Sequence, residues 1–173
     1  LVMDVDGDEY GDVIAQALPN VYWLEANDRA ASSWKSIKVG EVPATSHINS
    51  QGFAKAQIIA GGKEEFVIAG DGNIYSFEIP PKPESQEWTV TLVAANTSDE
   101  GIGTGDIDGD GDEDVLVTQC GRTAQLLLNE GGNQNREKLE IQRCDAASTV
   151  IVAYGRASSL ATGIGSPVIS HIP

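Results

Sequence analysis

Two short segments of the chain carry aspartates at every second position, which is the spacing of a cation-binding loop. The segments span residues 4–12 and 106–114, and in each one aspartates occupy positions 1, 3, 5 and 9. Alternate side chains on a tight turn point their oxygens toward one centre, and a backbone carbonyl at position 7 adds a further oxygen. The predicted metal ligands are Asp4, Asp6, Asp8, the Tyr10 carbonyl, Asp12, Asp106, Asp108, Asp110, the Asp112 carbonyl and Asp114.

An all-oxygen cage of this kind favours a hard cation of the size of Ca²⁺, which takes roughly 6–8 oxygen ligands. At position 6 the second loop has Gly111, which allows the positive φ that closes the turn, whereas the first loop has Glu9. We therefore expect Ca²⁺ in both loops, with weaker or more distorted binding in the first. The alternative is that both are merely solvated acidic turns. An EF-hand is excluded because position 12 of the second loop is Val117 and not a glutamate.

The loops belong to an internal repeat with a period of roughly 50 residues and about four short strands per unit. An apolar strand follows each loop, and a turn, another strand and a strand with period-2 alternation come next. The sequence predicts an all-β chain with repeats at 1–43, 44–95 and 96–147 and an irregular tail at 148–173. In the middle unit the metal loop has decayed and we expect no Ca²⁺ there. The residues that replace its four aspartates are Gln57, Ile59, Gly61 and Glu65.

A D-x-D-x-D-G-x-x-D loop that runs directly into the strand Val115–Val117 resembles the calcium hairpin of FG-GAP/VCBS repeats, the integrin-α-like β-propellers. The resemblance extends over roughly residues 1–145. It implies β-propeller blades, each a four-stranded antiparallel sheet, with a structural Ca²⁺ between the first two strands of a blade. It also implies an extracellular or cell-surface location, where millimolar Ca²⁺ fills even weak sites. Because propellers have about 4–8 blades, the remaining blades are expected from the same or another chain.

The composition argues against several classes of partner. The formal net charge is −15, whereas nucleic acids and anionic membranes require a basic surface. No apolar run approaches the ~18 residues of a membrane-spanning helix. The glycine-rich segment 101–105 leads into the second aspartate loop and not into a helix, so a phosphate-binding loop is rejected. We expect neither a nucleic-acid partner nor membrane insertion.

Three classes of function stay open at the level of sequence. The first is a binding or adhesion module for a carbohydrate or an extracellular protein. The second is the scaffold of a carbohydrate-active enzyme such as a polysaccharide lyase, and the third is a spacer. For the enzyme, His47 with Tyr22 or Tyr75 is the pair to test, and no catalytic residue is assigned. Cys120 and Cys144 are the only cysteines, and the sequence leaves their pairing open.

The three tryptophans are candidates either for packing or for ligand contact. Trp34 and Trp88 occur at equivalent positions of the repeat, which favours packing between blades. Trp23 breaks the repeat, because its counterparts are Ser76 and Leu127. An aromatic residue outside the structural pattern is suited to stacking on a sugar ring, so Trp23 is the predicted ligand-binding residue.

Overall fold

The computed structural model describes residues 1–17, 19–43, 52–58, 65–97, 100–118, 123–129 and 138–143. All regular secondary structure in these ranges is β-strand, so the predicted all-β class is confirmed for the described residues. The tail at 148–173, His47, Cys120 and Cys144 lie outside them. The strands are β1 (Val2–Met3), β2 (Asp12–Ala17), β3 (Asn20–Ala26), β4 (Trp34–Glu41), β5 (Phe53–Ala56), β6 (Glu65–Gly70), β7 (Asn73–Glu78), β8 (Thr89–Ala95), β9 (Gly101–Gly105), β10 (Asp114–Thr118), β11 (Thr123–Leu127) and β12 (Lys138–Arg143).

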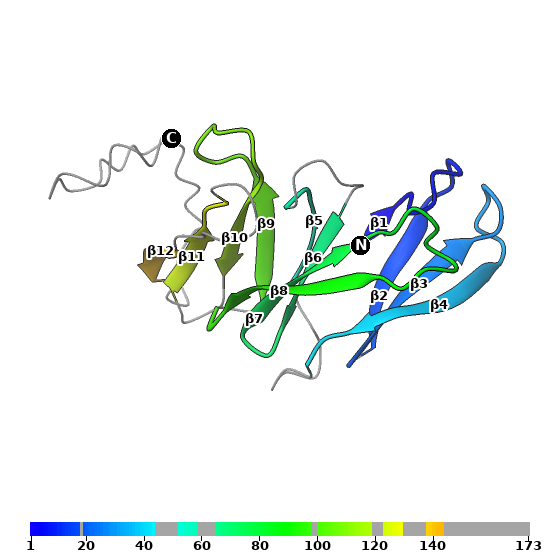
Figure 1. Cartoon of the computed structure of the whole chain (residues 1–173), viewed down its shortest axis with the longest axis horizontal. Helices are drawn as coiled ribbons and strands as arrows, with labels where there is room; N and C mark the ends of the chain where they lie inside the picture. The colour runs from blue at the N-terminus through cyan, green and yellow to red at the C-terminus, as the bar shows by residue number, and fades with distance from the viewer. Residues whose placement is uncertain are drawn as a thin grey trace, which may run out of the picture.

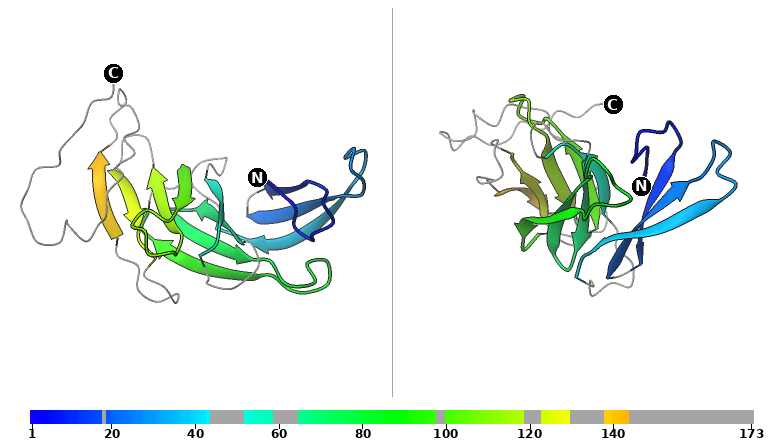
Figure 2. Two further views of the ribbon diagram at one scale, coloured as in Figure 1. Left: turned by 90° about the horizontal axis from the view of Figure 1, so that it is seen from above. Right: turned by 45° about the vertical axis from the view of Figure 1, so that its right-hand side comes forward.

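The strands form three four-stranded antiparallel sheets, each built from four consecutive strands. We call them sheet 1 (β1–β4), sheet 2 (β5–β8) and sheet 3 (β9–β12). The sheets follow one another along the molecule in chain order (Figures 1 and 2). Each sheet falls within one of the three repeats predicted from the sequence, and four antiparallel strands per unit is the predicted number.

The same register recurs in all three sheets. The second and third strands pair Val13 with Leu24 in sheet 1, Phe66 with Phe77 in sheet 2, and Val115 with Leu127 in sheet 3. A register shift between the third and fourth strands also falls at one equivalent place in each sheet, two to three residues before these partners on the third strand. Equivalent positions can therefore be compared directly between sheets.

The register divides each sheet into two faces, because directly paired residues point to the same side. We call face A the side of the pairs just given. Face B is the opposite side and carries the next pair along the second strand: Ile14 with Trp23, Val67 with Ser76, and Leu116 with Leu126. Both names are used in this sense below.

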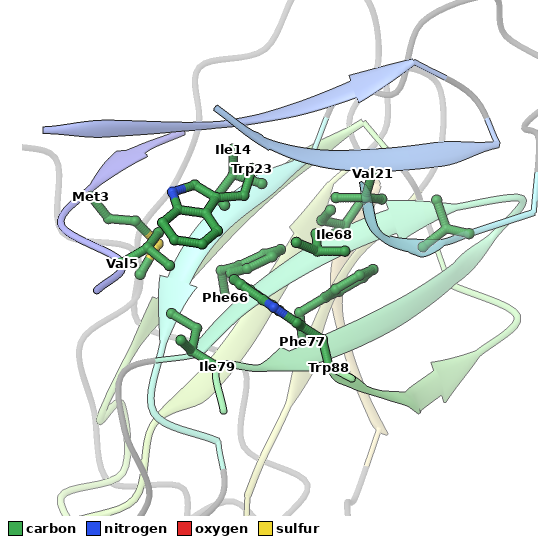
Figure 3. Close-up of a cluster of buried hydrophobic side chains, with 12 residues drawn as sticks. Met3, Val5, Ile14, Val21, Trp23, Phe66, Ile68, Phe77, Ile79 and Trp88 are labelled. Atoms are coloured by element: carbon green, nitrogen blue, oxygen red, sulfur yellow. The ribbon is translucent and has the colours of Figure 1, made fainter. Parts of the chain in front are cut away.

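Each of the two hydrophobic cores lies between neighbouring sheets and joins face B of one sheet to face A of the next. In the first core, Ile14, Val21 and Trp23 of sheet 1 pack on Phe66, Ile68 and Phe77 of sheet 2 (Figure 3). In the second core, Val67, Ala69 and Ile74 of sheet 2 pack on Val115, Val117 and Leu127 of sheet 3. The stacking is head-to-tail, since each interface joins two different faces.

Strand β6 lies at the centre of this arrangement, and all six of its residues are buried. Phe66 and Ile68 belong to the first core, whereas Val67 and Ala69 belong to the second. A strand covered on both faces needs a continuous apolar run and not an alternating one. The run Phe66–Ala69 therefore follows from the position of β6 between two sheets.

The prediction of Trp23 as a ligand-stacking residue is wrong. Its side chain is 0% exposed and lies in the first core, where its ring centroid is 6.2 Å from that of Trp88 (Figure 3). A ring enclosed in this way cannot stack on a sugar. Trp88 packs between sheets as predicted, and its indole N–H donates to the Pro83 carbonyl at 3.0 Å.

Trp34 differs from Trp88 although the two positions are equivalent. Trp34 pairs with Ala26 on face A of sheet 1 and is 43% exposed. Face A of sheet 2 is covered by sheet 1, so Trp88 is buried at 6% exposure. Among the described residues, no sheet covers face A of sheet 1. Trp34 is exposed because its face is uncovered, whereas the face that carries Trp88 is covered.

Candidate metal centre

The two aspartate loops occupy the same place in their sheets. The first spans residues 4–11 between β1 and β2, and the second spans residues 106–113 between β9 and β10. Position 9 of each loop, Asp12 or Asp114, is the first residue of the following strand. Each loop therefore joins the first two strands of a four-stranded sheet.

The carboxylate at position 1 closes each loop by accepting two backbone hydrogen bonds. Asp4 accepts from the N–H of Gly7 at 2.8 Å and from that of Glu9 at 3.0 Å. In the second loop Asp106 accepts from Gly109 at 2.7 Å and from Gly111 at 3.2 Å. The donors are positions 4 and 6 in both loops, so the same turn is built twice.

The carboxylates at positions 3 and 5 are oriented by the backbone two residues later. Asp6 accepts from the N–H of Asp8 at 3.1 Å, and Asp8 accepts from that of Tyr10 at 2.7 Å. Asx turns of this kind fix the side chain relative to its own backbone. The second loop repeats both bonds, with Asp108 accepting from Asp110 at 3.1 Å and Asp110 from Asp112 at 2.9 Å.

The carboxylate at position 9 is buried and ties the loop to the sheet. Asp114 is 0% exposed, and its two oxygens accept from the N–H of Ile107 at 2.8 Å and of Asn129 at 2.8 Å. Asp12 is 1% exposed and accepts in the same way from Val5 at 3.1 Å and Ala26 at 2.9 Å. One donor is position 2 of the loop. The other is Ala26, the last residue of β3, or Asn129, which lies two residues beyond the end of β11. Position 9 therefore fixes the loop against its own sheet.

The backbone at positions 4 and 6 adopts positive φ in both loops. Position 4 is Gly7 with φ 82° or Gly109 with φ 83°, and position 6 is Glu9 with φ 70° or Gly111 with φ 99°. Glu9 was singled out from the sequence because glycine is expected there. The structure gives Glu9 the conformation that glycine adopts at no steric cost and that other residues adopt only with strain.

Three carboxylates converge in each loop, but these sets of three do not include all the predicted ligands. In the first loop, ligand oxygens of Asp4, Asp6 and Asp8 all lie within 4.8 Å of one another, and in the second loop those of Asp106, Asp108 and Asp114 do. Among the described residues, these are the groups of metal-binding side chains that the fold brings together. Asp12 and Asp110 fall outside them, and Tyr10 and Asp112 were predicted to offer only carbonyl oxygens. A set made of carboxylate oxygens alone fits a hard divalent cation such as Ca²⁺.

Burial and mutual repulsion disfavour the charged state of two of these groups. The pKa of Asp6 is raised, mainly by desolvation and further by the charges of Asp8, Asp12 and Asp4. The pKa of Asp114 is also raised, mainly by burial, and the charge of Asp108 adds to the effect. A bound cation would offset both causes, because it neutralises the repulsion and replaces lost hydration.

The middle sheet has a different arrangement at the corresponding place. Glu65, which replaces the position-9 aspartate, is 0% exposed and accepts a hydrogen bond from the Ser76 hydroxyl at 3.1 Å. Gln57 occupies position 1 with an amide, and Ile59 and Gly61 lie outside the described residues. That this loop holds no Ca²⁺ stays a prediction.

The fold and the loops define a class of protein, namely an all-β repeat protein of four-stranded antiparallel sheets stacked head-to-tail. Residues 62–117 match the family model of the FG-GAP-like repeat. The match runs from the middle sheet through the second aspartate loop into β10, so this part of the chain is similar to an FG-GAP-like repeat. No curated protein and no solved structure was found to match the chain. In the described part of the chain no helix is long and apolar enough to cross a membrane.

Proposed function

We propose that the chain is a calcium-stabilised part of a β-propeller that acts as an extracellular binding or adhesion module. The observation that carries the calcium proposal is the pair of loops with one hydrogen-bond scheme. Six backbone-to-carboxylate bonds recur at the same loop positions, although the two loops lie about 100 residues apart (residues 4–12 and 106–114). The scheme orients carboxylates of each loop toward one centre, with ligand oxygens within 4.8 Å of one another, and this arrangement supports a cation site.

The proposed role of Ca²⁺ is structural. Three carboxylates with oxygens within 4.8 Å of one another repel each other in the absence of a cation. Ca²⁺ binds the folded loop and has little affinity for the unfolded chain, so it stabilises the fold by mass action. Sites of this kind filled at millimolar Ca²⁺ suit an extracellular or cell-surface location, which the match of residues 62–117 to the FG-GAP-like repeat also favours.

The propeller proposal rests on the head-to-tail stacking of the sheets. Face B of sheet 1 covers face A of sheet 2, and face B of sheet 2 covers face A of sheet 3. Such a series can close only when further sheets join the last face B to the first face A. Face A of sheet 1 carries two of the exposed large hydrophobic residues, Val2 at 64% and Trp34 at 43% exposure. We propose that further blades of the same or another chain cover it.

The proposed ligand is a carbohydrate or an extracellular protein bound by loops of the propeller. The burial of Trp23 removes the one sugar-stacking residue that the sequence offered, so the assignment of a ligand rests on the fold family. The enzyme scaffold is not proposed further, because its candidate His47 lies outside the described residues.

Thermal unfolding in Ca²⁺, in Mg²⁺ and in EDTA tests the metal role. The isosteric variants Asp6→Asn and Asp108→Asn each remove one converging charge from the first and the second loop. The matched control is Asp71→Asn, because Asp71 lies in the exposed β6–β7 turn and belongs to neither group. We expect a Ca²⁺-specific rise in Tm that each loop variant reduces and the control retains. Equal Tm values in Ca²⁺ and EDTA for a cooperatively unfolding chain would refute the calcium proposal.

A further inference from the structure

Asn129 connects the second aspartate loop to the neighbouring sheet. The residue follows β11 closely and is 4% exposed. Its backbone N–H donates to Asp114 at 2.8 Å, while its side-chain amide donates to the carbonyls of Ile58 at 2.9 Å and of Glu113 at 3.2 Å. One residue thus holds a predicted metal ligand of sheet 3 and, across the interface, the backbone of sheet 2.

Glu113 makes a second connection beside the first. One of its carboxylate oxygens accepts from the backbone N–H of Gln57 at 2.6 Å. Gln57 and Ile58 are positions 1 and 2 of the decayed loop in sheet 2, and Ile58 is 2% exposed in the core between sheets 2 and 3. We call the four residues Gln57, Ile58, Glu113 and Asn129 the interface clamp.

The first aspartate loop provides an internal comparison. There the position-9 carboxylate of Asp12 accepts from the N–H of Ala26, which has no side-chain donor. Among the described residues, no sheet faces the side of sheet 1 that would correspond to this clamp. The chain therefore contains two loops with the same internal bonds, of which the second alone carries an asparagine at the position that joins it to a neighbouring sheet.

We propose that Asn129 is a positioning residue for the second metal loop, and that through it Ca²⁺ at residues 106–114 strengthens the packing of sheet 2 on sheet 3. The inference rests on the proposed calcium function. An ion that fixes Asp114 also fixes the backbone of Asn129, and hence the direction of the side-chain amide that holds Ile58. The loop then acts on the sheet interface and not only on its own hairpin.

Reciprocity gives the size of the effect. If Ca²⁺ strengthens the clamp by some factor, loss of the clamp must weaken Ca²⁺ binding by the same factor. A buried neutral hydrogen bond contributes enough to shift an equilibrium about threefold to tenfold. We therefore expect Asn129→Ala to weaken Ca²⁺ binding at the second loop by about fivefold and to leave the first loop unchanged.

The test is amide hydrogen exchange, residue by residue, with Ca²⁺ and with EDTA, alongside calorimetric titration of the two sites. The reporter is the Gln57 amide, which belongs to sheet 2 and contacts no predicted ligand of the ion directly. Glu113→Ala is the second variant and serves if Asn129→Ala does not fold. It removes the bond between Glu113 and Gln57 without opening the core. The matched control is Leu126→Val on face B of sheet 3, which loosens the sheet on the side away from the clamp.

In the natural sequence, Ca²⁺ is expected to slow exchange both at residues 106–114 and at Gln57. Each clamp variant should keep the first effect and lose most of the second, whereas Leu126→Val should keep both. If Ca²⁺ protects the loop but leaves Gln57 unchanged, or if the clamp variants bind Ca²⁺ as tightly as the natural chain, the coupling is refuted and the calcium function stands. If Ca²⁺ changes neither, the calcium function fails and the coupling fails with it.

Discussion

Replacing Glu9 with glycine should stabilise the first aspartate loop. Glu9 lies at φ 70°, where a residue with a Cβ is strained by about 1–2 kcal/mol. The equivalent residue of the second loop is Gly111, which has φ 99°. Glu9→Gly therefore gives the first loop the residue that its backbone conformation favours, while the hydrogen bond from its N–H to Asp4 is retained.

Two terms oppose the gain. Glycine increases the conformational entropy of the unfolded chain, which costs roughly 0.5–1 kcal/mol. The variant also loses the ion pair between Glu9 and Arg29, but that pair spans 3.7 Å between side chains that are 83% and 76% exposed. An exposed pair of this kind is worth a few tenths of a kcal/mol. The net gain is about 0.5 kcal/mol, or roughly 1–2 °C in Tm for a chain of this size.

The sharper readout is Ca²⁺ affinity at the first loop, because an ion binds only the closed turn. We expect calorimetric titration to give about a twofold tighter site. The control is Glu9→Ala, which removes the same carboxylate and the same ion pair but keeps a Cβ at positive φ. If Glu9→Ala improves affinity and Tm as much as Glu9→Gly does, the gain comes from charge and the strain argument is refuted.

Three further predictions follow from the loops, the core and an ion-pair network. Gly111→Ala should lower stability by about 0.5–1 kcal/mol in chemical denaturation, because strain of about 1–2 kcal/mol is partly offset by the reduced entropy of the unfolded chain. No atom lies within 4 Å of the added Cβ, so a neutral result would mean that position 6 does not require positive φ. Phe66→Ala should cost about 3–5 kcal/mol, since this 0% exposed ring stacks on Phe77 at a centroid distance of 4.9 Å; a loss below ~1 kcal/mol would contradict the first core. Lys35→Met should lower stability at pH 7 and by less at pH 4, as measured by urea unfolding at both pH values. Burial already raises the pKa of Glu25, which Lys35 contacts at 3.3 Å. Loss of the Lys35 cation raises the pKa of Glu25 further, so protonation of Glu25 at low pH restores stability to the variant. An equal loss of stability at both pH values would exclude the ion pair as the cause.

The convergence of the loop aspartates was predictable because these residues are local in sequence. Asp106 and Asp114 lie within nine consecutive residues, and the spacing of two residues alone turns the side chains toward one centre. The unusual Glu9 was also visible, since position 6 is fixed by counting from Asp4. The repeat gave the number of strands per sheet for the same reason, because each hairpin forms between neighbouring segments.

Features that depend on distant segments were not predictable. Trp23 was assigned to a ligand because it breaks the repeat, yet its size is matched to Trp88 of the next sheet, which no local pattern reveals. The contacts of Asn129 with Ile58 and of Glu113 with Gln57 join residues that are 71 and 56 positions apart. A polar residue directly after the apolar segment of β11 was the one signal that Asn129 offered.

The glycine-rich strand β9 illustrates a third case. The segment Gly101–Gly105 has low strand propensity. From the sequence it was considered only as a phosphate-binding loop, which was rejected, and no strand was predicted there. In the structure it pairs with β10 over its whole length. A Cβ on Gly101 would lie 2.5 Å from the Thr118 hydroxyl oxygen, so a larger residue there would force the Thr118 side chain to move. Pairing with β10 outweighs the low intrinsic strand preference of the segment.

The two unlike faces of each sheet have a consequence for how such a chain can change in length. A sheet with two unlike faces can pack its face A on the sheet before it and its face B on the sheet after it, as sheet 2 does. Duplicating or deleting a whole four-stranded sheet therefore leaves every interface as a contact of face B with face A. If the interfaces instead joined two like faces, either event would bring unlike faces together. For the same reason, no single interface between two sheets determines how many sheets the series contains.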